Sequence, residues 1–301
     1  VFRLASISKG FSSVLAGLLV NKGYLGWNDR IKDHLPQFRL KTSSSTESLT
    51  IRHTLSQTSG LKKYAGSSLI YQGLTYPNIL RKMCYANIET KPAKVYAYQN
   101  AMFSVISEVA KSVTELTFEQ LLDSMLFAPL GMSDASVGYN AMLNTQNKGF
   151  PHILSREKWK SANIRKNWYN VAPAAGINAS IADMAIWLQT MLGHRSDIVP
   201  QKVLDEIFTP HIPMNEDSDY YEIWFPGLSQ ASYGMGWRIF NYNNHKIVYH
   251  GGFVRGFRPE MGFCPKEDVG IVFLTNSSKN ELSTTCVRAF FDLYFAPRLS
   301  L

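Results

Sequence analysis

The stretch VFRLASISKGFSSVLAGLLVNKG (residues 1–23) contains the first predicted helix and the first candidate catalytic residues. Apolar residues recur in it at helical spacing, which predicts a helix over residues 6–23 that ends at Gly23. The helix is apolar on almost all sides, so we expect it to lie in the core. Ser6 would stand at its N-terminus, and Lys9 would follow one turn later on the same face.

The pattern Ser-x-x-Lys is short and decides nothing alone, because the chain contains it three times: Ser6/Lys9, Ser59/Lys62 and Ser155/Lys158. Ser59 is expected at the C-terminal end of a short helix over 49–61, where the helix dipole is unfavourable for a nucleophile that needs positive potential. The third pair falls in the charged stretch 155–170, which offers no apolar wall around a lysine. Ser6 and Lys9 are therefore the best candidates.

A serine paired with a lysine in this way can act as a nucleophile. Serine attacks a carbonyl only if a neighbouring base takes its proton. A lysine one turn away can serve as that base when burial lowers its pKa, because desolvation disfavours the charged form. The free amides of a helix N-terminus can also stabilise an oxyanion. Ser6 and Lys9 meet these requirements.

The rest of the chain divides into a helical middle and a strand-rich end. The spacing of apolar residues predicts that residues 77–130 are largely helical. Residues 173–192 are expected to form a loop and then a helix, whose N-terminus has Ser180 and Asp183 placed as a capping box. After residue 232 the pattern changes to strands joined by tight turns, and a last amphipathic helix follows over 283–295. The strands are expected within 232–242, 245–252, 257–265 and 268–277.

This order of elements predicts an α+β protein, an antiparallel sheet flanked by helices with an inserted helical lobe. We expect one domain over residues 1–301. Its α/β lobe would comprise residues 1–50 and 225–301, and its helical lobe about residues 51–224.

Composition excludes several classes of protein. The chain is 45% hydrophobic and 18% charged, which suits a folded core. Its net charge of +8 comes from scattered lysines and arginines, so we expect no nucleic-acid partner. The pattern His-Glu-x-x-His is absent, and no metal or cofactor is expected. The three cysteines, Cys84, Cys264 and Cys286, lie too far apart for a disulfide framework, and at most one bridge could form.

With its Ser-x-x-Lys at residues 6–9, the sequence resembles the penicillin-recognising serine hydrolases. These include class C β-lactamases, D-alanyl-D-alanine carboxypeptidases, D-aminopeptidases and β-lactamase-like esterases. The resemblance extends over residues 1–301 and implies a β-lactamase-like (DD-peptidase) fold. It also implies a helix and two strands before the first motif, so we expect N-terminal strands to be missing from the sheet. Two further motifs should follow, a Tyr-x-Asn and a Lys/His-x-Gly on a strand.

The second motif has four candidates: Tyr76/Asn78, Tyr85/Asn87, Tyr98/Asn100 and Tyr242/Asn244. The family form resembles Pro-Gly-x-x-x-x-Tyr-x-Asn followed by an apolar helix. Pro92 stands at the required distance before Tyr98 and Asn100, although Ala93 occupies the glycine position. The alternative, residues 85–87, lacks the proline. We favour Tyr98 and Asn100.

The third motif is His250-Gly251-Gly252 in VYHGGF (residues 248–253). Glycines within a strand allow another backbone to approach closely. By resemblance, the backbone amides of Ser6 and Phe253 would form the oxyanion hole, and this strand would bind the substrate.

The resemblance also implies the remaining roles. Ser6 would attack an amide or ester carbonyl, and Lys9 and Tyr98 would transfer the proton of the Ser6 hydroxyl. In one version of this transfer, Tyr98 is a phenolate held by Lys9. Asn100 would bind the substrate amide and orient Lys9. Where the family usually has lysine, His250 is mostly neutral at pH 7, since the ordinary pKa of histidine is about 6.5. We therefore expect uncharged esters or amides to be preferred over penicillins.

The leading hypothesis is thus a serine hydrolase that forms an acyl-enzyme on β-lactams, D-Ala-terminated peptides or simple esters. The alternative is a covalent penicillin receptor that does not hydrolyse, or an inactive truncated scaffold. By resemblance, we expect a periplasmic or cell-envelope location, although no signal peptide is visible in the chain.

Overall fold

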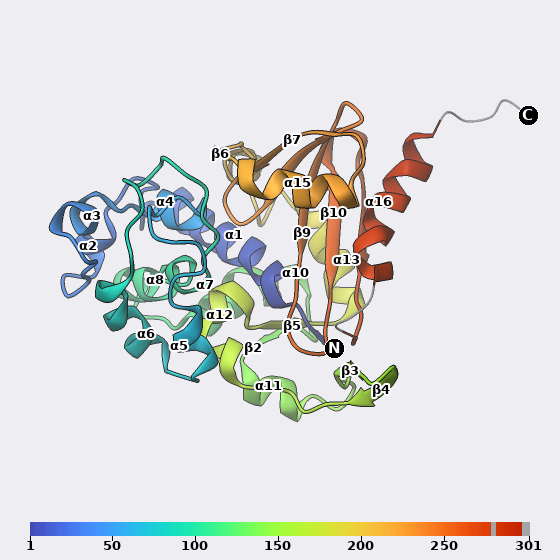
Figure 1. The fold of residues 1–301 in the computed structure, drawn as a ribbon, viewed down its shortest axis with the longest axis horizontal. Helices are drawn as coiled ribbons and strands as arrows, with labels where there is room; N and C mark the ends of the chain where they lie inside the picture. Colours follow the sequence, from blue (N-terminus) through green and yellow to red (C-terminus); the bar gives the residue numbers. More distant parts are fainter. Residues whose placement is uncertain (278–280, 297–301) are drawn as a thin grey trace, which may run out of the picture.

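A large antiparallel sheet forms the strand-rich half of the protein (Figure 1). The computed structural model describes residues 1–277 and 281–296. Within them this sheet has six strands in the order β11-β10-β9-β8-β7-β6. Their bounds are β6 Ile212–Pro213, β7 Leu228–Tyr233, β8 Arg238–Tyr242, β9 His245–Gly251, β10 Glu260–Cys264 and β11 Val269–Phe273. The strands predicted after residue 232 are confirmed.

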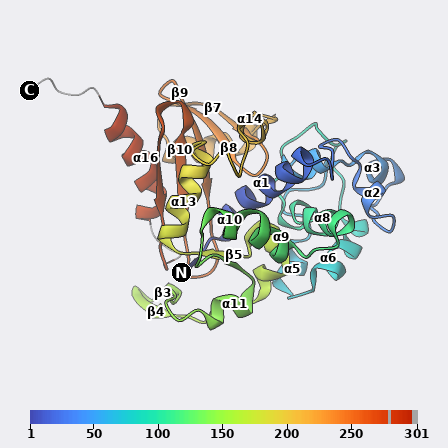
Figure 2. The same cartoon turned by 180° about the vertical axis from the view of Figure 1, so that it is seen from behind.

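Helices cover both faces of this sheet. On one face α1 (Ser8–Asn21) and α13 (Ile181–Met191) pack in a core that includes Val248 of β9. On the other, α15 (Asn215–Trp224) and α16 (Glu281–Phe295) pack in a second cluster that includes Tyr249. Successive residues of a strand point to opposite faces, which explains this division. Figure 1 shows α15 in front of the sheet, and Figure 2, seen from the opposite side, shows α13 in front of the other face.

Short helices make up most of the rest of the molecule, and several of them surround the far end of α1 (Figure 1). Their bounds are α2 Ile31–His34, α3 Ser43–Ser48, α4 Ile51–Leu55, α5 Ser67–Tyr71, α6 Tyr76–Lys82, α7 Asn100–Phe103, α8 Ile106–Thr114, α9 Phe118–Leu122, α10 Ala128–Leu130, α11 Tyr139–Asn144, α12 Ala172–Ala175 and α14 Gln201–Ile207. None of the helices in the described residues is both long and apolar enough to cross a membrane.

Two small sheets were not predicted. Strands β1 (Phe2–Arg3), β5 (Ile177–Ala179) and β2 (Ser136–Val137) pair in the order β1-β5-β2 and tie the start of the chain to residues near α13. Strands β3 (His152–Ser155) and β4 (Lys158–Ser161) form a hairpin in the stretch expected to be a charged loop. Strands this short carry no measurable period in the sequence.

The predicted helix boundaries hold best where a cap is present. Ser180 accepts a hydrogen bond from the Asp183 backbone N–H at 3.1 Å, and Asp183 accepts one from the Ser180 N–H at 2.9 Å, which is the predicted capping box of α13. By contrast, α4 ends at Leu55 rather than continuing to Ser59.

Candidate active site

Ser6 lies in a strained turn at the start of the central helix. It belongs to the 3-10 helix η1 (Ala5–Ile7), which leads directly into α1. The preceding residue, Ala5, has a φ of 46°, a left-handed conformation that costs an L-residue roughly 1–2 kcal/mol. Strain of this kind concentrates at functional sites, where surrounding structure holds it in place.

Lys9 is fully buried beside Ser6. Its Nζ lies 3.4 Å from Ser6 Oγ and donates hydrogen bonds to Asn100 Oδ1 at 2.7 Å and to the Ala174 carbonyl at 3.0 Å. Among the described residues, no carboxylate pairs with it. Burial lowers the pKa of Lys9 well below its ordinary value, and the positive charge of Arg238 lowers it further. The neutral amine is therefore favoured.

Tyr98 and Asn100 are positioned by a buried network around the residue between them. Gln99 donates from its side chain to the carbonyls of Leu61 and Lys62 at 2.9 and 3.0 Å. The side-chain oxygen Oε1 of Gln99 accepts a hydrogen bond from Ser59 Oγ at 2.6 Å, and the Gln99 backbone N–H donates one to Gln57 Oε1 at 2.7 Å. Ser59, from the second Ser-x-x-Lys pattern, therefore has a structural contact: its hydrogen bond to Gln99 stabilises the turn that contains Tyr98.

The Tyr98 ring packs against Ser6 and Lys9. Lys9 Nζ lies 4.7 Å from the ring centroid, and a side-chain hydrogen bond joins Tyr98 to Ser6. Burial raises the pKa of Tyr98 to about 12, although Arg238 and the bond with Ser6 oppose this shift. The phenolate anticipated from the sequence is therefore disfavoured in the free protein, and Tyr98 is a neutral phenol at pH 7.

The end of β9 closes against the backbone that precedes Ser6. A Cβ at Gly252 would lie 2.5 Å from the Leu4 carbonyl oxygen, so only glycine allows this approach. A Cβ at Gly251 would lie 2.2 Å from Glu260 Oε2. Both glycines line the pocket together with Phe253, whose side chain is 62% exposed. The strand therefore brings the Phe253 backbone next to the turn that holds Ser6.

His250 differs from the sequence expectation, in which its side chain meets the substrate. The ring is fully buried and does not line the pocket. Its Nε2 lies 3.3 Å from the Tyr233 hydroxyl, and its Nδ1 lies 2.7 Å from the Gly251 carbonyl oxygen. Burial lowers the pKa of His250 well below its ordinary value, with Arg238 and Lys9 adding to the shift. His250 is neutral and shapes the strand from behind.

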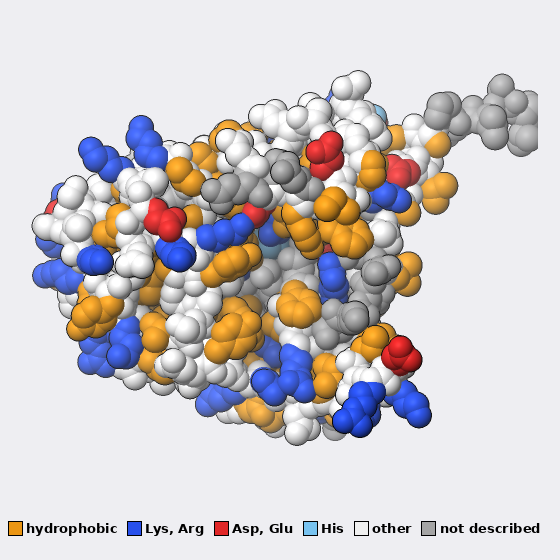
Figure 3. Space-filling model, viewed as in Figure 1, with side chains coloured by type: hydrophobic (Ala, Val, Ile, Leu, Met, Phe, Trp, Pro, Cys, Tyr) orange, Lys and Arg blue, Asp and Glu red, His pale blue; other side chains and the backbone are white. Residues whose placement is uncertain are grey.

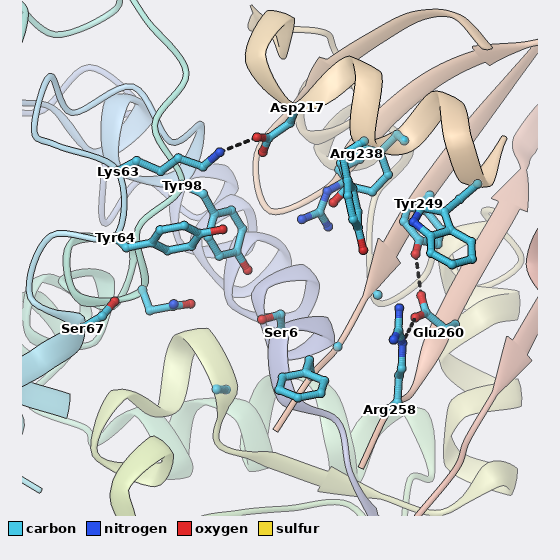
Figure 4. A pocket seen from close by; sticks show the side chains of 18 of the residues that line it. Ser6, Lys63, Tyr64, Ser67, Tyr98, Asp217, Arg238, Tyr249, Arg258 and Glu260 are labelled. Carbon is cyan, nitrogen blue, oxygen red and sulfur yellow. Dashed lines mark hydrogen bonds and ion pairs between the residues drawn. The ribbon is translucent and has the colours of Figure 1, made fainter. Parts of the chain in front are cut away.

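A pocket of about 790 Å³ opens above Ser6 between the helical half and the sheet. A recess with hydrophobic side chains along its rim is visible near the centre of this face (Figure 3). Figure 4 shows Ser6 and Tyr98 facing Arg238, Tyr249 and Glu260 across the pocket. Ser6, Tyr98, Asn100, Gly251, Gly252 and Phe253 line it, so the structure brings the three predicted motifs together.

Several pocket residues were missed from the sequence: Lys63, Asp217, Arg238, Tyr249, Arg258 and Glu260. One signal could have revealed Arg238 and Glu260, because each interrupts an apolar strand where a charge is uncommon. Lys63 and Asp217 form an ion pair between the helical half and α15, which no local pattern could predict.

The rival motifs lie elsewhere. Tyr85 is 79% exposed at the end of a 3-10 helix (Met83–Tyr85), and Ser155 and Lys158 belong to the β3-β4 hairpin. The three cysteines are free thiols. Within residues 1–277 and 281–296, no group of three acidic, histidine or cysteine side chains could hold a metal ion.

Known proteins similar to this chain include Protein flp of Staphylococcus aureus (strain MRSA252). It is 24% identical over 280 residues, which cover 91% of this chain and 52% of the relative. Beta-lactamase-like protein 4 of Dictyostelium discoideum is 23% identical over 309 residues, which cover 94% of this chain and 52% of the relative. The chain thus spans about half the length of these curated relatives.

Among solved structures, the octameric penicillin-binding protein homologue from Pyrococcus abyssi superposes with a TM-score of 0.83 at 20% identity. The match covers 97% of this chain and 65% of the homologue. This likeness confirms the fold class predicted from the sequence. A family model described as Beta-lactamase matches residues 1–288, which include all three motifs. The chain belongs to the beta-lactamase family.

Proposed function

We propose that the protein is a serine hydrolase that acts on amide or ester carbonyls through an acyl-enzyme. The observation that carries this proposal is the buried Lys9, which pairs with no carboxylate among the described residues and whose Nζ lies 3.4 Å from Ser6 Oγ. Ser6 lines an open pocket. A lysine with this environment supports the activation of a serine, because its neutral form can accept the hydroxyl proton.

The contacts of Lys9 suit this first step. A neutral amine has two hydrogens and one lone pair. Asn100 Oδ1 and the Ala174 carbonyl accept the two hydrogens, which leaves the lone pair for the Ser6 hydroxyl. Ser6 Oγ attacks the substrate carbonyl carbon as its proton passes to Lys9 Nζ. The tetrahedral intermediate then carries one negative oxygen.

The oxyanion would lie between the backbone amides of Ser6 and Phe253, where the strand end approaches the nucleophile turn. Amides fixed in this way stabilise the developing charge. Tyr98, a neutral phenol bonded to Ser6, would give its proton to the leaving group and regain one from Lys9. The acyl group is then bound to Ser6, and water activated by the same pair releases it as a carboxylic acid.

The test is a time course with a fluorescent penicillin and with a p-nitrophenyl ester. A burst of p-nitrophenol followed by steady turnover is expected, since acylation and deacylation are separate steps. A label that persists without turnover would support the covalent receptor instead. The absence of both label and turnover would identify an inactive scaffold and overturn the proposal.

A further inference from the structure

A second pocket lies outside the active site, between the β3-β4 hairpin and the turn that follows β9. Its volume is about 360 Å³, within the range of roughly 300–1,000 Å³ that is usual for small-molecule sites. It shares no lining residue with the active-site pocket, although Arg255 on its wall closely follows Phe253 in the chain. We call it the basic pocket, after the cations among the polar residues that line it: Lys160, Arg165, Arg255, Ser155, Ser161 and Asn163.

The basic pocket concentrates positive charge. Its three cations are exposed, and the segment 155–166 contains five lysines and arginines but one glutamate. Among the side chains that the structure describes, no carboxylate lies within ion-pair distance of Lys160, Arg165 or Arg255. Figure 3 shows Lys and Arg side chains gathered over the β3-β4 hairpin. Like charges held close together repel one another, so an anion that lies between them stabilises the arrangement.

The hairpin presents its lysines on one face. Strand pairing places Ile153 opposite Lys160 and Ser155 opposite Lys158, and both Ile153 and Ser155 line the basic pocket. Residues that lie opposite each other in an antiparallel pair share a face of the sheet. Lys158 therefore lies on the same face as Lys160 and adds a further positive charge beside the pocket.

The opposite wall is a tight turn with a fixed position. Val254 and Phe257 exchange backbone hydrogen bonds at 3.2 and 2.9 Å, and Arg255 lies at the tip between them. A Cβ at Gly256, whose φ is 80°, would lie 2.2 Å from the Cβ of Pro151, so the tip packs against the residue before β3. This contact holds the backbone of Arg255 beside the hairpin.

A fourth cation lies next to Arg165. Arg3 is only 2% exposed, and its Nη1 donates a hydrogen bond to the Arg165 carbonyl oxygen at 3.2 Å. Its Nε and Nη2 are buried without a hydrogen-bond acceptor among the described residues, and the Tyr169 ring, 4.0 Å from the guanidinium carbon, takes the place of a carboxylate. Buried charges are screened much less than exposed ones. Arg3 therefore strengthens the positive potential at this wall.

We propose that the basic pocket binds a phosphate monoester, which is either a free ester or the head group of a lipid. Such a group carries about 1.5 to 2 negative charges at pH 7 and three strong acceptor oxygens. Lys160, Arg165 and Arg255 supply charged donors for these oxygens, and arginine suits phosphate because it can donate two parallel hydrogen bonds. A carboxylate has less charge and fewer oxygens, so it would leave part of this donor set unused. The site is separate from Ser6 and does not depend on the proposed hydrolase chemistry.

Titration calorimetry with glycerol 3-phosphate tests the free ester. The controls are glycerol, which is neutral, and glycerate, which carries one carboxylate. We expect glycerol 3-phosphate to bind at a single site and at least roughly 10-fold more tightly than glycerate, since it forms more charge-assisted hydrogen bonds. Arg165→Gln and Arg255→Gln should each weaken this binding about 10-fold. Cosedimentation with vesicles of phosphatidic acid and phosphatidylcholine, compared with phosphatidylcholine alone, tests the lipid head group.

Arg81→Gln is the matched control, because it removes the same charge from α6, far from the hairpin (Figure 1). It should leave both kinds of binding unchanged, and thermal unfolding checks that every variant keeps the fold. Binding of glycerol 3-phosphate that depends on Arg165 and Arg255 supports a free ester. Binding to the phosphatidic acid vesicles alone, with the same dependence, supports a lipid head group. No binding of either probe, equal binding of glycerate, or an equal loss in Arg81→Gln would overturn the proposal.

Discussion

At the scale of single residues, the site depends on which groups are kept neutral. Lys9 and His250 are both fully buried and both close to the charge of Arg238, and for each the pKa is lowered by burial first and by that charge second. Burial raises the pKa of Tyr98 to about 12 for the same reason. A neutral amine beside a neutral phenol is the state from which a proton can be taken from Ser6 and passed on.

Tyr98→Phe should lower turnover by about 10²- to 10⁴-fold, the range lost when a general acid or base is removed. The substitution keeps the ring that packs over Lys9 and removes only the hydroxyl that bonds Ser6. Tyr85→Phe is the matched control, because Tyr85 is 79% exposed outside the pocket. Steady-state kinetics on one ester measure the turnover of both variants, and an equal loss of turnover in the two would show that the Tyr98 hydroxyl takes no part in the reaction.

At the scale of elements, the active site is assembled by short segments that long-range contacts hold in place. The turn with Tyr98 leads into α7, which begins at Asn100, and residues 57–62 fix this turn through Gln99. The order and spacing of the motifs singled out Tyr98 and Asn100, because proline spacing is local information, and the structure places both residues at the pocket. The same sequence did not predict β1, β2 and β5, since strands of two or three residues form only when their partners are already in place.

Ala93 offers a test of the same turn. It has a φ of 68°, so an alanine occupies a left-handed position where the family pattern has glycine. Ala93→Gly should raise the free energy of unfolding by about 0.5–1 kcal/mol, because the strain of the Cβ is removed. Ala97→Gly should lower it by at least a similar amount, since glycine there adds freedom to the unfolded chain and the change removes a buried methyl group. Urea unfolding of both variants measures the difference, and a loss of stability in Ala93→Gly would contradict the strain.

At the scale of the whole molecule, the pocket exists only where the two halves meet. Ser6 begins the central helix and Tyr98 lies just before α7, whereas Arg238, Tyr249 and Glu260 come from adjacent strands of the sheet (Figure 4). Motif spacing along the chain predicted the first group, and it could not predict the second. The direction in which Arg238 points depends on strand register and on the packing of α15, which no single stretch of sequence specifies.

Glu260 predicts how the stability of the molecule changes with pH. Burial raises the pKa of this carboxyl from 4.5 to about 7, and bonds from Tyr249 and Arg258 only partly oppose the shift. Between these values the folded state holds a proton that the unfolded state has lost. The free energy of unfolding should therefore fall as pH rises from 4.5 to 7. This group would account for roughly 3 kcal/mol of the fall.

Glu260→Gln should flatten that part of the profile, because glutamine does not titrate. The control is Glu89→Gln, since Glu89 is exposed and should leave the profile unchanged. Denaturant unfolding at a series of pH values gives both curves. An unchanged slope in Glu260→Gln would show that the carboxyl of Glu260 is ionised throughout this range.

Ser6 is the proposed nucleophile, and the mass of the intact protein after reaction with a fluorophosphonate shows whether it is. We expect one adduct, mapped to Ser6 by peptide analysis, in the wild type and in the Ser59→Ala and Ser155→Ala variants. The Ser59 variant should react more slowly, since Ser59 Oγ donates to Gln99 and supports the Tyr98 turn. Ser6→Ala should gain no mass. An adduct that persists in Ser6→Ala, or a wild-type protein that gains none, would exclude Ser6 as the nucleophile.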